Sequence, residues 1–152
     1  MQKYLGAVAL AAMLAQPAAA VTFPSLTTIY VGSGVESFGP ELATILHCSN
    51  VSGVTVDLRF LFLTNGGGDI AGTHTVTGVS HGQTYRVATQ GTTFSEDFVF
   101  VPAASVSGGV VNIESTNSAV FCTAKVVNPQ IDGPSGFALP MVRVNPHPGT
   151  VE

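Results

Sequence analysis

Two cysteines, Cys48 and Cys122, each lie in a run of residues that alternates between two faces, as a β-strand does. In the first run, Cys48 shares its face with Leu42, Thr44 and Leu46. In the second run, Cys122 shares its face with Val120, Ala124 and Val126. Because both thiols point to the buried side, we expect a disulfide that joins opposite halves of a β-sandwich. It would close a loop of about 75 residues and stabilise the fold by on the order of 4.5 kcal/mol. The alternative is two separate buried thiols.

The first twenty residues have the pattern of a secretory signal peptide. Lys3 gives a short positive segment, residues 4–14 are apolar, and Ala18-Ala19-Ala20 fits the small-residue cleavage pattern. The apolar segment is too short to span a bilayer stably, and no later stretch is long and apolar enough. We therefore expect a secreted protein, either periplasmic or extracellular at the cell surface, with no membrane insertion after cleavage. An oxidising destination permits the disulfide.

Charge is sparse: only 9% of the residues are Asp, Glu, Lys or Arg, and the formal net charge is −4. This balance disfavours binding to nucleic acid or to anionic membranes. The polar surface must come largely from Thr, Ser, Asn and the backbone. Such a surface is common among extracellular β-proteins that form assemblies or bind neutral ligands.

Short alternating runs separated by turn residues continue along the chain, and no run has a convincing helical period. Besides the two cysteine strands, we expect strands at residues 26–35, 53–63, 72–79, 83–89, 93–101, 110–115 and 137–144. Pro140 cannot donate to a ladder, so we place it at an edge or a bulge. The predicted fold is a single antiparallel β-sandwich of about eight strands, Ig-like or jelly-roll-like. It occupies residues 21–144, after a signal peptide at 1–20 and before an extended tail at 145–152.

The segment Gly78-Val79-Ser80-His81-Gly82 matches the G-x-S-x-G nucleophile elbow of serine hydrolases. That elbow requires a helix after the serine, whereas residues 83–89 alternate like a strand. Asp97 or Asp132 with His147 would complete a triad in the required chain order. Two glycines that bracket a hairpin turn explain the match better, so we assign no catalytic residue.

The histidines form no H-x-H or HExxH pattern, so we predict no metal ligand and no cofactor. His74 and His81 flank a turn and would be the nearest to a metal pair. Glu96 and Asp97 are adjacent and therefore face opposite ways on a strand, which argues against a catalytic dyad. Asn50-Val51-Ser52 is a formal glycosylation sequon whose use the sequence does not decide.

Three stretches resemble secreted bacterial β-sandwich proteins to which no activity is assigned. They are Leu46-His47-Cys48-Ser49-Asn50, Phe121-Cys122-Thr123-Ala124, and Val142-Arg143-Val144-Asn145 with Pro148-Gly149-Thr150. The resemblance implies a secreted β-domain and no functional residues. Fimbrial subunits are similar in size, secretion, low charge and cysteine count, but this chain lacks their aromatic residue near the C-terminus.

These observations favour an exported, non-enzymatic protein with a structural or surface-interaction role, as a subunit of an extracellular assembly. The expected partners are further copies of the chain or other cell-surface components. The expected assembly surface combines Ile29 and Val31, on an apolar first strand able to add to a neighbour's sheet, with Leu61 and Leu63. The alternatives are a small-ligand or glycan-binding module that uses Tyr85, Asn65 and Asp69, and a small hydrolase that uses Ser80.

Overall fold

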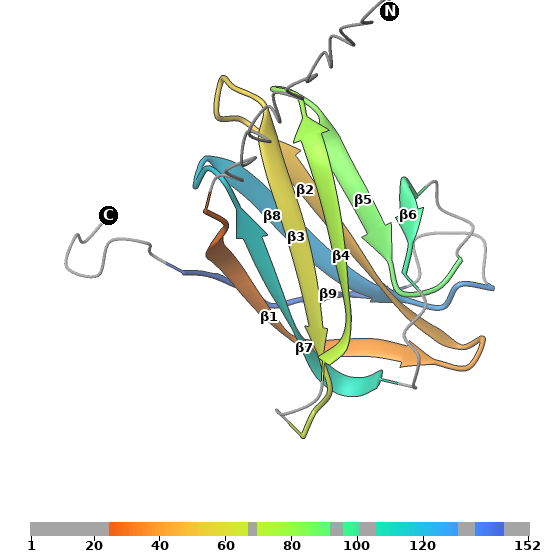
Figure 1. The fold of residues 1–152 in the computed structure, drawn as a ribbon. Coiled ribbons are helices and arrows are strands. Elements are labelled where there is room, and N and C mark those ends of the chain that lie inside the picture. Colours follow the sequence, from red (N-terminus) through yellow and green to blue (C-terminus); the bar gives the residue numbers. More distant parts are fainter. Residues whose placement is uncertain (1–24, 67–69, 92–95, 101–105, 131–135, 145–152) are drawn as a thin grey trace, which may run out of the picture.

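The computed structural model describes residues 25–66, 70–91, 96–100, 106–130 and 136–144, so the expected signal peptide and C-terminal tail lie outside the described residues. Within these ranges the protein is all-β and contains no helix (Figure 1). The strands are β1 (Thr27–Phe38), β2 (Leu42–Asn50), β3 (Val56–Leu63), β4 (Ile70–Val79), β5 (Thr84–Ala88), β6 (Phe98–Val99), β7 (Val106–Ser115), β8 (Val120–Val127), β9 (Gly136–Leu139) and β10 (Met141–Arg143).

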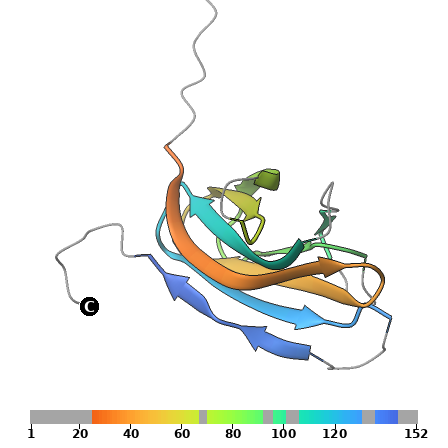
Figure 2. The same ribbon diagram turned by 90° about the horizontal axis from the view of Figure 1, so that it is seen from below.

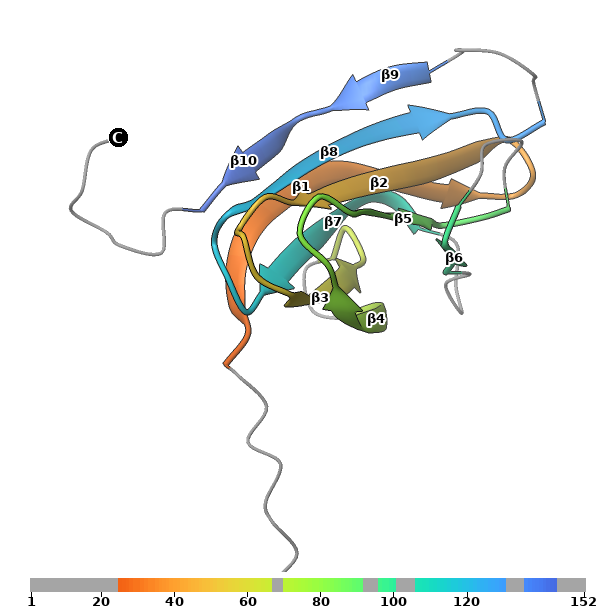
Figure 3. The ribbon, with the colours of Figure 1, turned by 90° about the horizontal axis from the view of Figure 1, so that it is seen from above.

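These strands form one curled sheet, not two separate sheets. Its main path runs β4-β3-β7-β1-β2-β5-β6, while β8 pairs with β2 and β9, and β10 pairs with β1. Seen from above, the β4–β3–β7 part faces the β8–β2–β5 part, and β9 and β10 run outside β8 (Figure 3). All pairs are antiparallel except β5–β6, which is parallel, so the sheet is mixed, whereas we expected an antiparallel one.

Strand β1 is long and bent, and it connects the two parts of the sheet (Figure 2). It pairs with β7 along most of its length, with β10 near its start and with β2 at its end. The register with β7 shifts around Gly34, whose φ of 83° is in the left-handed region that favours glycine. Because both of its edges are occupied, β1 cannot add to a neighbour's sheet, and that expectation was wrong.

The inner face of the curled sheet holds the core, as the alternation predicts. Its largest fully buried side chains include Phe60, Phe62, Leu58, Ile113 and Leu46. The residues between them on the same strands face outward, such as Asn112 and Glu114 on β7. Pro140 separates β9 from β10 at the point where the chain changes partner from β8 to β1, in agreement with its predicted place outside a regular ladder.

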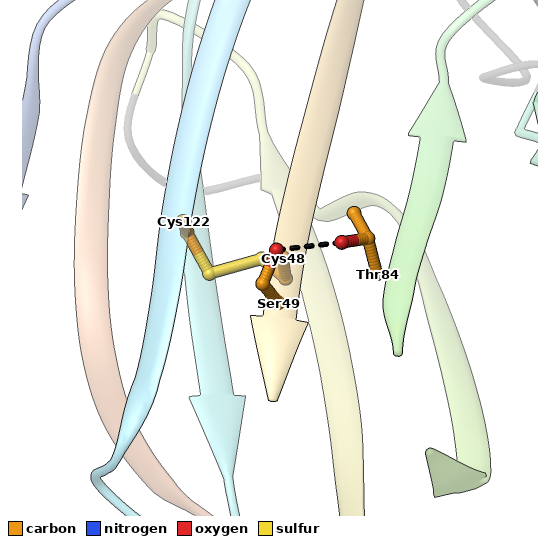
Figure 4. Close-up of a disulfide and its surroundings, with 4 residues drawn as sticks. All are labelled: Cys48, Ser49, Thr84 and Cys122. Carbon is orange, nitrogen blue, oxygen red and sulfur yellow. Dashed lines mark hydrogen bonds between the residues drawn. A yellow bond between two sulfur atoms is a disulfide. The ribbon is translucent and has the colours of Figure 1, made fainter. Parts of the chain in front are cut away.

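The disulfide between Cys48 and Cys122 is present, as predicted, but it does not cross the core (Figure 4). The two cysteines lie directly opposite each other on the neighbouring strands β2 and β8, with their Cα atoms 4.2 Å apart. A separation near 4.5 Å is typical of a non-hydrogen-bonded antiparallel pair. Both side chains remain on the buried face, at 0% and 3% exposure. The bridge therefore locks one strand pair in register.

An aromatic seam closes the side of the fold where β4 and the β5–β6 pair are not hydrogen-bonded to each other. The ring of His74 stacks on Phe98 with a centroid distance of 3.6 Å, and its Nε2 lies 2.9 Å from the Tyr85 hydroxyl. Two residues further along β3 from Phe60, the Phe62 ring stacks on the Phe100 ring, with their centroids 4.8 Å apart. Side-chain packing, not a backbone ladder, thus joins the β4 end of the sheet to the β6 end.

Gly72 on β4 makes room for this seam. A Cβ atom at position 72 would overlap the Phe100 ring, because three ring carbons occupy that space. We expect Gly72→Ala to displace Phe100 from Phe62 and to lower the free energy of unfolding by about 1–3 kcal/mol, as overpacking does. Chemical denaturation measures the effect. In a Phe100→Leu background, the same Gly72→Ala change should cost less, because only the backbone strain from the φ of 156° at this position remains; an equal cost in both backgrounds would show that the Phe100 ring is not displaced.

Candidate interaction surface

A band of apolar side chains crosses the outer face of the β10–β1–β7–β3 part of the sheet. Val142, Val31, Asn112 and Leu61 are consecutive cross-strand partners on these four strands. Leu63 and its partner Val110 lie beside them on the same face. We call this the outer apolar patch, and its members are Val31, Leu61, Leu63, Val110 and Val142. Val142 is 66% exposed and the other four are half-buried.

Three of the four residues expected to form an assembly surface lie in this patch, and the fourth does not. Ile29 is in the core at 1% exposure, so its inclusion was wrong. The register between β1 and β7 shifts between Thr28 and Tyr30, and this bulge turns both Ile29 and Tyr30 inward. Strict alternation therefore fails at this position, although Val31 faces outward as predicted.

Sequence reasoning missed Val110 and Val142 as members of the patch. Val110 precedes the inward Val111, and Val142 follows Met141 in a short strand. Alternation on each strand places both of them on the outer face. Val110 and Val142 come close to Val31, Leu61 and Leu63 only because of the order of the strands in the sheet. The alternation of apolar and polar residues along one strand does not reveal that order.

A charge pair borders the outer apolar patch on one side. Arg59 on β3 and Glu114 on β7 are cross-strand partners and form a salt bridge on the same face as Leu61. Glu114 is largely covered, with a side-chain exposure of 14%, whereas Arg59 is 40% exposed. The pair is electrically balanced, so it leaves the apolar patch without a dominant local charge.

The outer face of the other half of the sheet, on β8, β2 and β5, carries a polar row as well as the exposed Phe121. Thr123, His47 and Arg86 are partners in one cross-strand row, and Arg86 binds Asp97 through two side-chain hydrogen bonds of 3.1 and 3.2 Å. The hydrogen bond from Arg86 is the main cause of a lowered pKa for Asp97. Burial, followed by the charges of Lys125 and Arg86, lowers the pKa of His47, while Asp97 opposes the shift.

Two histidines should make stability depend on pH. The pKa of His74 is lowered by burial in the seam, and that of His47 is lowered mainly by burial. The unfolded chain takes up these protons near pH 6.5, and the folded protein takes them up only at lower pH. Since the unfolded state then binds more protons, we expect the free energy of unfolding to fall as the pH decreases from about 7 to about 5.

Urea denaturation across this pH range measures that dependence. The double variant His47→Gln, His74→Gln should have a flatter profile than the wild type, whatever its stability at neutral pH. Asp97 does not interfere in this window, because the stability from its lowered pKa is lost only when the pH falls below about 4. An unchanged slope in the double variant would contradict the assignment.

Ser80 lies in a turn between two strands and not before a helix. Strand β4 ends at Val79, strand β5 begins at Thr84, and the backbone N–H of Ser80 donates to the Gln83 side chain. This is the strand–turn–strand context that the sequence predicted, and it differs from the nucleophile elbow. Of the triad candidates, Asp132 and His147 lie outside the described residues, while Asp97 is bound to Arg86.

The histidines beside this turn are not brought together. His74 is held in the aromatic seam, whereas His81 accepts a 3.0 Å hydrogen bond at Nδ1 from the backbone N–H of Gly53. Across the described part of the chain, no group of three or more His, Cys, Asp or Glu side chains is arranged to hold a metal ion.

Asn50, the acceptor of the sequon, is completely buried. Its Nδ2 donates to the carbonyl oxygens of Val54 and Val79 at 2.6 and 2.8 Å, and its Oδ1 accepts from the backbone and hydroxyl of Ser52 at 2.9 and 2.7 Å. Both side-chain N–H groups are therefore used inside the protein. A glycan on Nδ2 would require this corner to unfold, so the geometry argues against modification of the folded chain.

The residues expected to form a sugar site are not gathered in the described part of the chain. Tyr85 points inward and contacts His74, which is opposite Phe60 on β3. Asn65 lies five residues beyond Phe60, in the turn after β3, or roughly 16 Å along an extended strand. Asp69 is outside the described residues.

Comparisons with known proteins do not assign the chain to a family. No protein-family model matches the chain, and neither the curated proteins nor the solved structures give a match. Among the described residues, no helix has the length and apolar character needed to cross a membrane.

Proposed function

We propose that this chain is an exported, non-enzymatic protein with a structural or surface-interaction role, and that it acts as a subunit of an extracellular assembly. The outer apolar patch is the observation that carries the proposal. Five apolar side chains from four strands lie on the same outer face around Asn112, with Val142 opposite Val31 and Leu63 opposite Val110. Apolar side chains that cluster on an outer surface are a feature of interaction sites.

Two further observations support this proposal. The Cys48–Cys122 disulfide is consistent with an oxidising, exported location. Charged residues make up only 9% of the chain, so few like charges oppose contact between copies. Both observations agree with a protein that works outside the cytoplasm in contact with other molecules.

The test is the association state of the chain from residue 21 onward, as wild type and with the outer apolar patch altered. Sedimentation velocity from about 1 μM to about 1 mM covers association free energies of about −8 to −4 kcal/mol. We expect the wild type to form species larger than a monomer, and Leu61→Glu with Val142→Glu to shift the distribution to smaller species.

The matched control is Thr123→Glu, which adds a charge to an exposed position on the outer face of β8, away from the patch. It should associate as the wild type does. Thermal unfolding verifies that each variant is folded. A wild type that stays monomeric throughout, or a patch variant that associates normally, would contradict the proposal.

A further inference from the structure

Among the described strands, β4 is the end of the sheet on the β3 side. It pairs only with β3, and its neighbour across the seam, the β5–β6 pair, meets it through side chains. An edge strand presents unpaired backbone N–H and C=O groups, which form a template for another strand. Natural proteins usually protect such edges by shortness, charge or proline.

The other described strands with a single partner are protected by shortness, charge or proline, whereas β4 has only its two register shifts and the aromatic rings that pack against His74 and Gly72. Strand β6 is two residues long and follows Glu96 and Asp97, β9 is four residues long and ends before Pro140, and β10 is three residues long and contains Arg143. In contrast, β4 has ten residues with no Asp, Glu, Lys, Arg or Pro.

The central part of β4 is regular and well held. Residues 72–76 pair with β3 without a register shift, and shifts occur on either side of this segment. Thr73 and Thr75 are exposed on the outer face, while His74 between them is fixed in the aromatic seam. The two bulges limit pairing to this central segment, where the backbone already has strand geometry and little ordering cost remains for a partner.

We propose that a second copy of this chain docks on the β4 edge, by antiparallel pairing of residues 72–76 of one copy with the same segment of the other. A two-fold symmetric pair places a strand against itself, so any charge on the segment would meet its like. Residues 72–76 carry no formally charged side chain at neutral pH, apart from the histidine whose pKa burial lowers. The threonines would form cross-strand pairs, which stabilise antiparallel contacts.

This inference rests on the proposed function and specifies how two subunits meet. Thr73 is the β4 partner of Leu61, which belongs to the outer apolar patch. Pairing at the β4 edges would therefore extend the same outer face across two copies and bring the two patches onto one side. A paired unit would present twice the apolar surface for further assembly.

The test uses charge on the two exposed threonines of β4. We expect the variant Thr73→Lys, Thr75→Lys to be monomeric at concentrations where the wild type dimerises, because lysines then face each other in every symmetric register that keeps these faces aligned. Thr73→Glu, Thr75→Glu should be monomeric for the same reason. An equimolar mixture of the two variants should recover the dimer. The control, Ser107→Lys with Thr123→Lys, changes two exposed positions away from β4 and should dimerise normally.

The outcomes separate this inference from the proposed function. If both charged β4 variants still dimerise, or if their mixture stays monomeric, pairing at β4 is overturned. If Leu61→Glu with Val142→Glu reduces association while the β4 variants retain it, the proposed function stands and the β4 inference fails. A wild type that is monomeric at all concentrations overturns both.

Discussion

Reduction of the Cys48–Cys122 disulfide is expected to lower the free energy of unfolding by about 4.5 kcal/mol, a large part of the stability of a domain this size. The two residues are separated by 74 positions, so the bridge removes many conformations from the unfolded chain. In the folded protein it joins the directly opposite positions of β2 and β8. Without the disulfide, folding must bring β2 and β8 together from an unrestrained chain, and the loss of conformational entropy on closing this long loop opposes folding.

Guanidinium denaturation with and without reductant measures this loss. The matched control is the double variant Cys48→Ala, Cys122→Ala, which should already be destabilised and should not respond to reductant. Since both side chains are buried, the variant also loses some packing. A midpoint that does not move on complete reduction of the wild type would contradict a structural role for the bridge.

Replacement of Asn50 by alanine is expected to lower the free energy of unfolding by about 4 kcal/mol. The change removes four hydrogen bonds made by a side chain with 0% exposure. The Val79 carbonyl oxygen, 2.8 Å from the Asn50 amide nitrogen, then loses this donor. Each net hydrogen bond contributes about 1 kcal/mol, and an unsatisfied buried group costs more. The corner that joins β2 to β3 and contacts the end of β4 should loosen.

Asn112→Ala is the matched control, because Asn112 is half-buried on the outer face of β7 and should change stability by less than about 0.5 kcal/mol. Asn50→Asp provides a second test, since it keeps the acceptor and removes both donors. Expression in a glycosylating host should give no glycan at Asn50 in folded protein. A stable Asn50→Ala variant, or a glycan at Asn50 on folded protein, would contradict the buried role.

Much of the local structure could be predicted from the sequence, because alternation reports which side of a strand is buried. The strands around Val111 and Ile113, around Tyr85 and Val87, and around both cysteines occur at the predicted places. Alternation also indicated that both cysteines face inward. Pro140, between β9 and β10, also predicted an interruption in strand pairing, because proline has no backbone N–H to donate.

The arrangement of the strands could not be predicted in the same way. Two inward thiols can meet across a core or between neighbouring strands, and periodicity does not distinguish these cases. Nor does it show that β1 is paired on both edges or that a bulge turns Ile29 inward. These features depend on pairing between distant parts of the chain, which is a property of the whole sheet.

The surface features were predicted in part for the same reason. Leu61 and Leu63 were recognised as outward apolar residues on a single strand, but the patch also needs Val110 and Val142 from β7 and β10. The seam of His74, Tyr85 and Phe98 joins three strands whose proximity no short-range pattern reveals. The use of the Asn50 sequon could not be decided from the sequence, because the carbonyl oxygens of Val54 and Val79 that bind its side chain are brought to it only by the fold.

The proposed role of this chain is that of an exported subunit that works in an assembly outside the cytoplasm. The most direct measurement is the intact mass and sedimentation of the native protein recovered from fractions of the cells that make it. We expect a chain that begins at Val21, has Cys48 bonded to Cys122 and sediments as a species larger than the monomer outside the cytoplasm. A full-length, reduced monomer confined to the cytoplasm would contradict it.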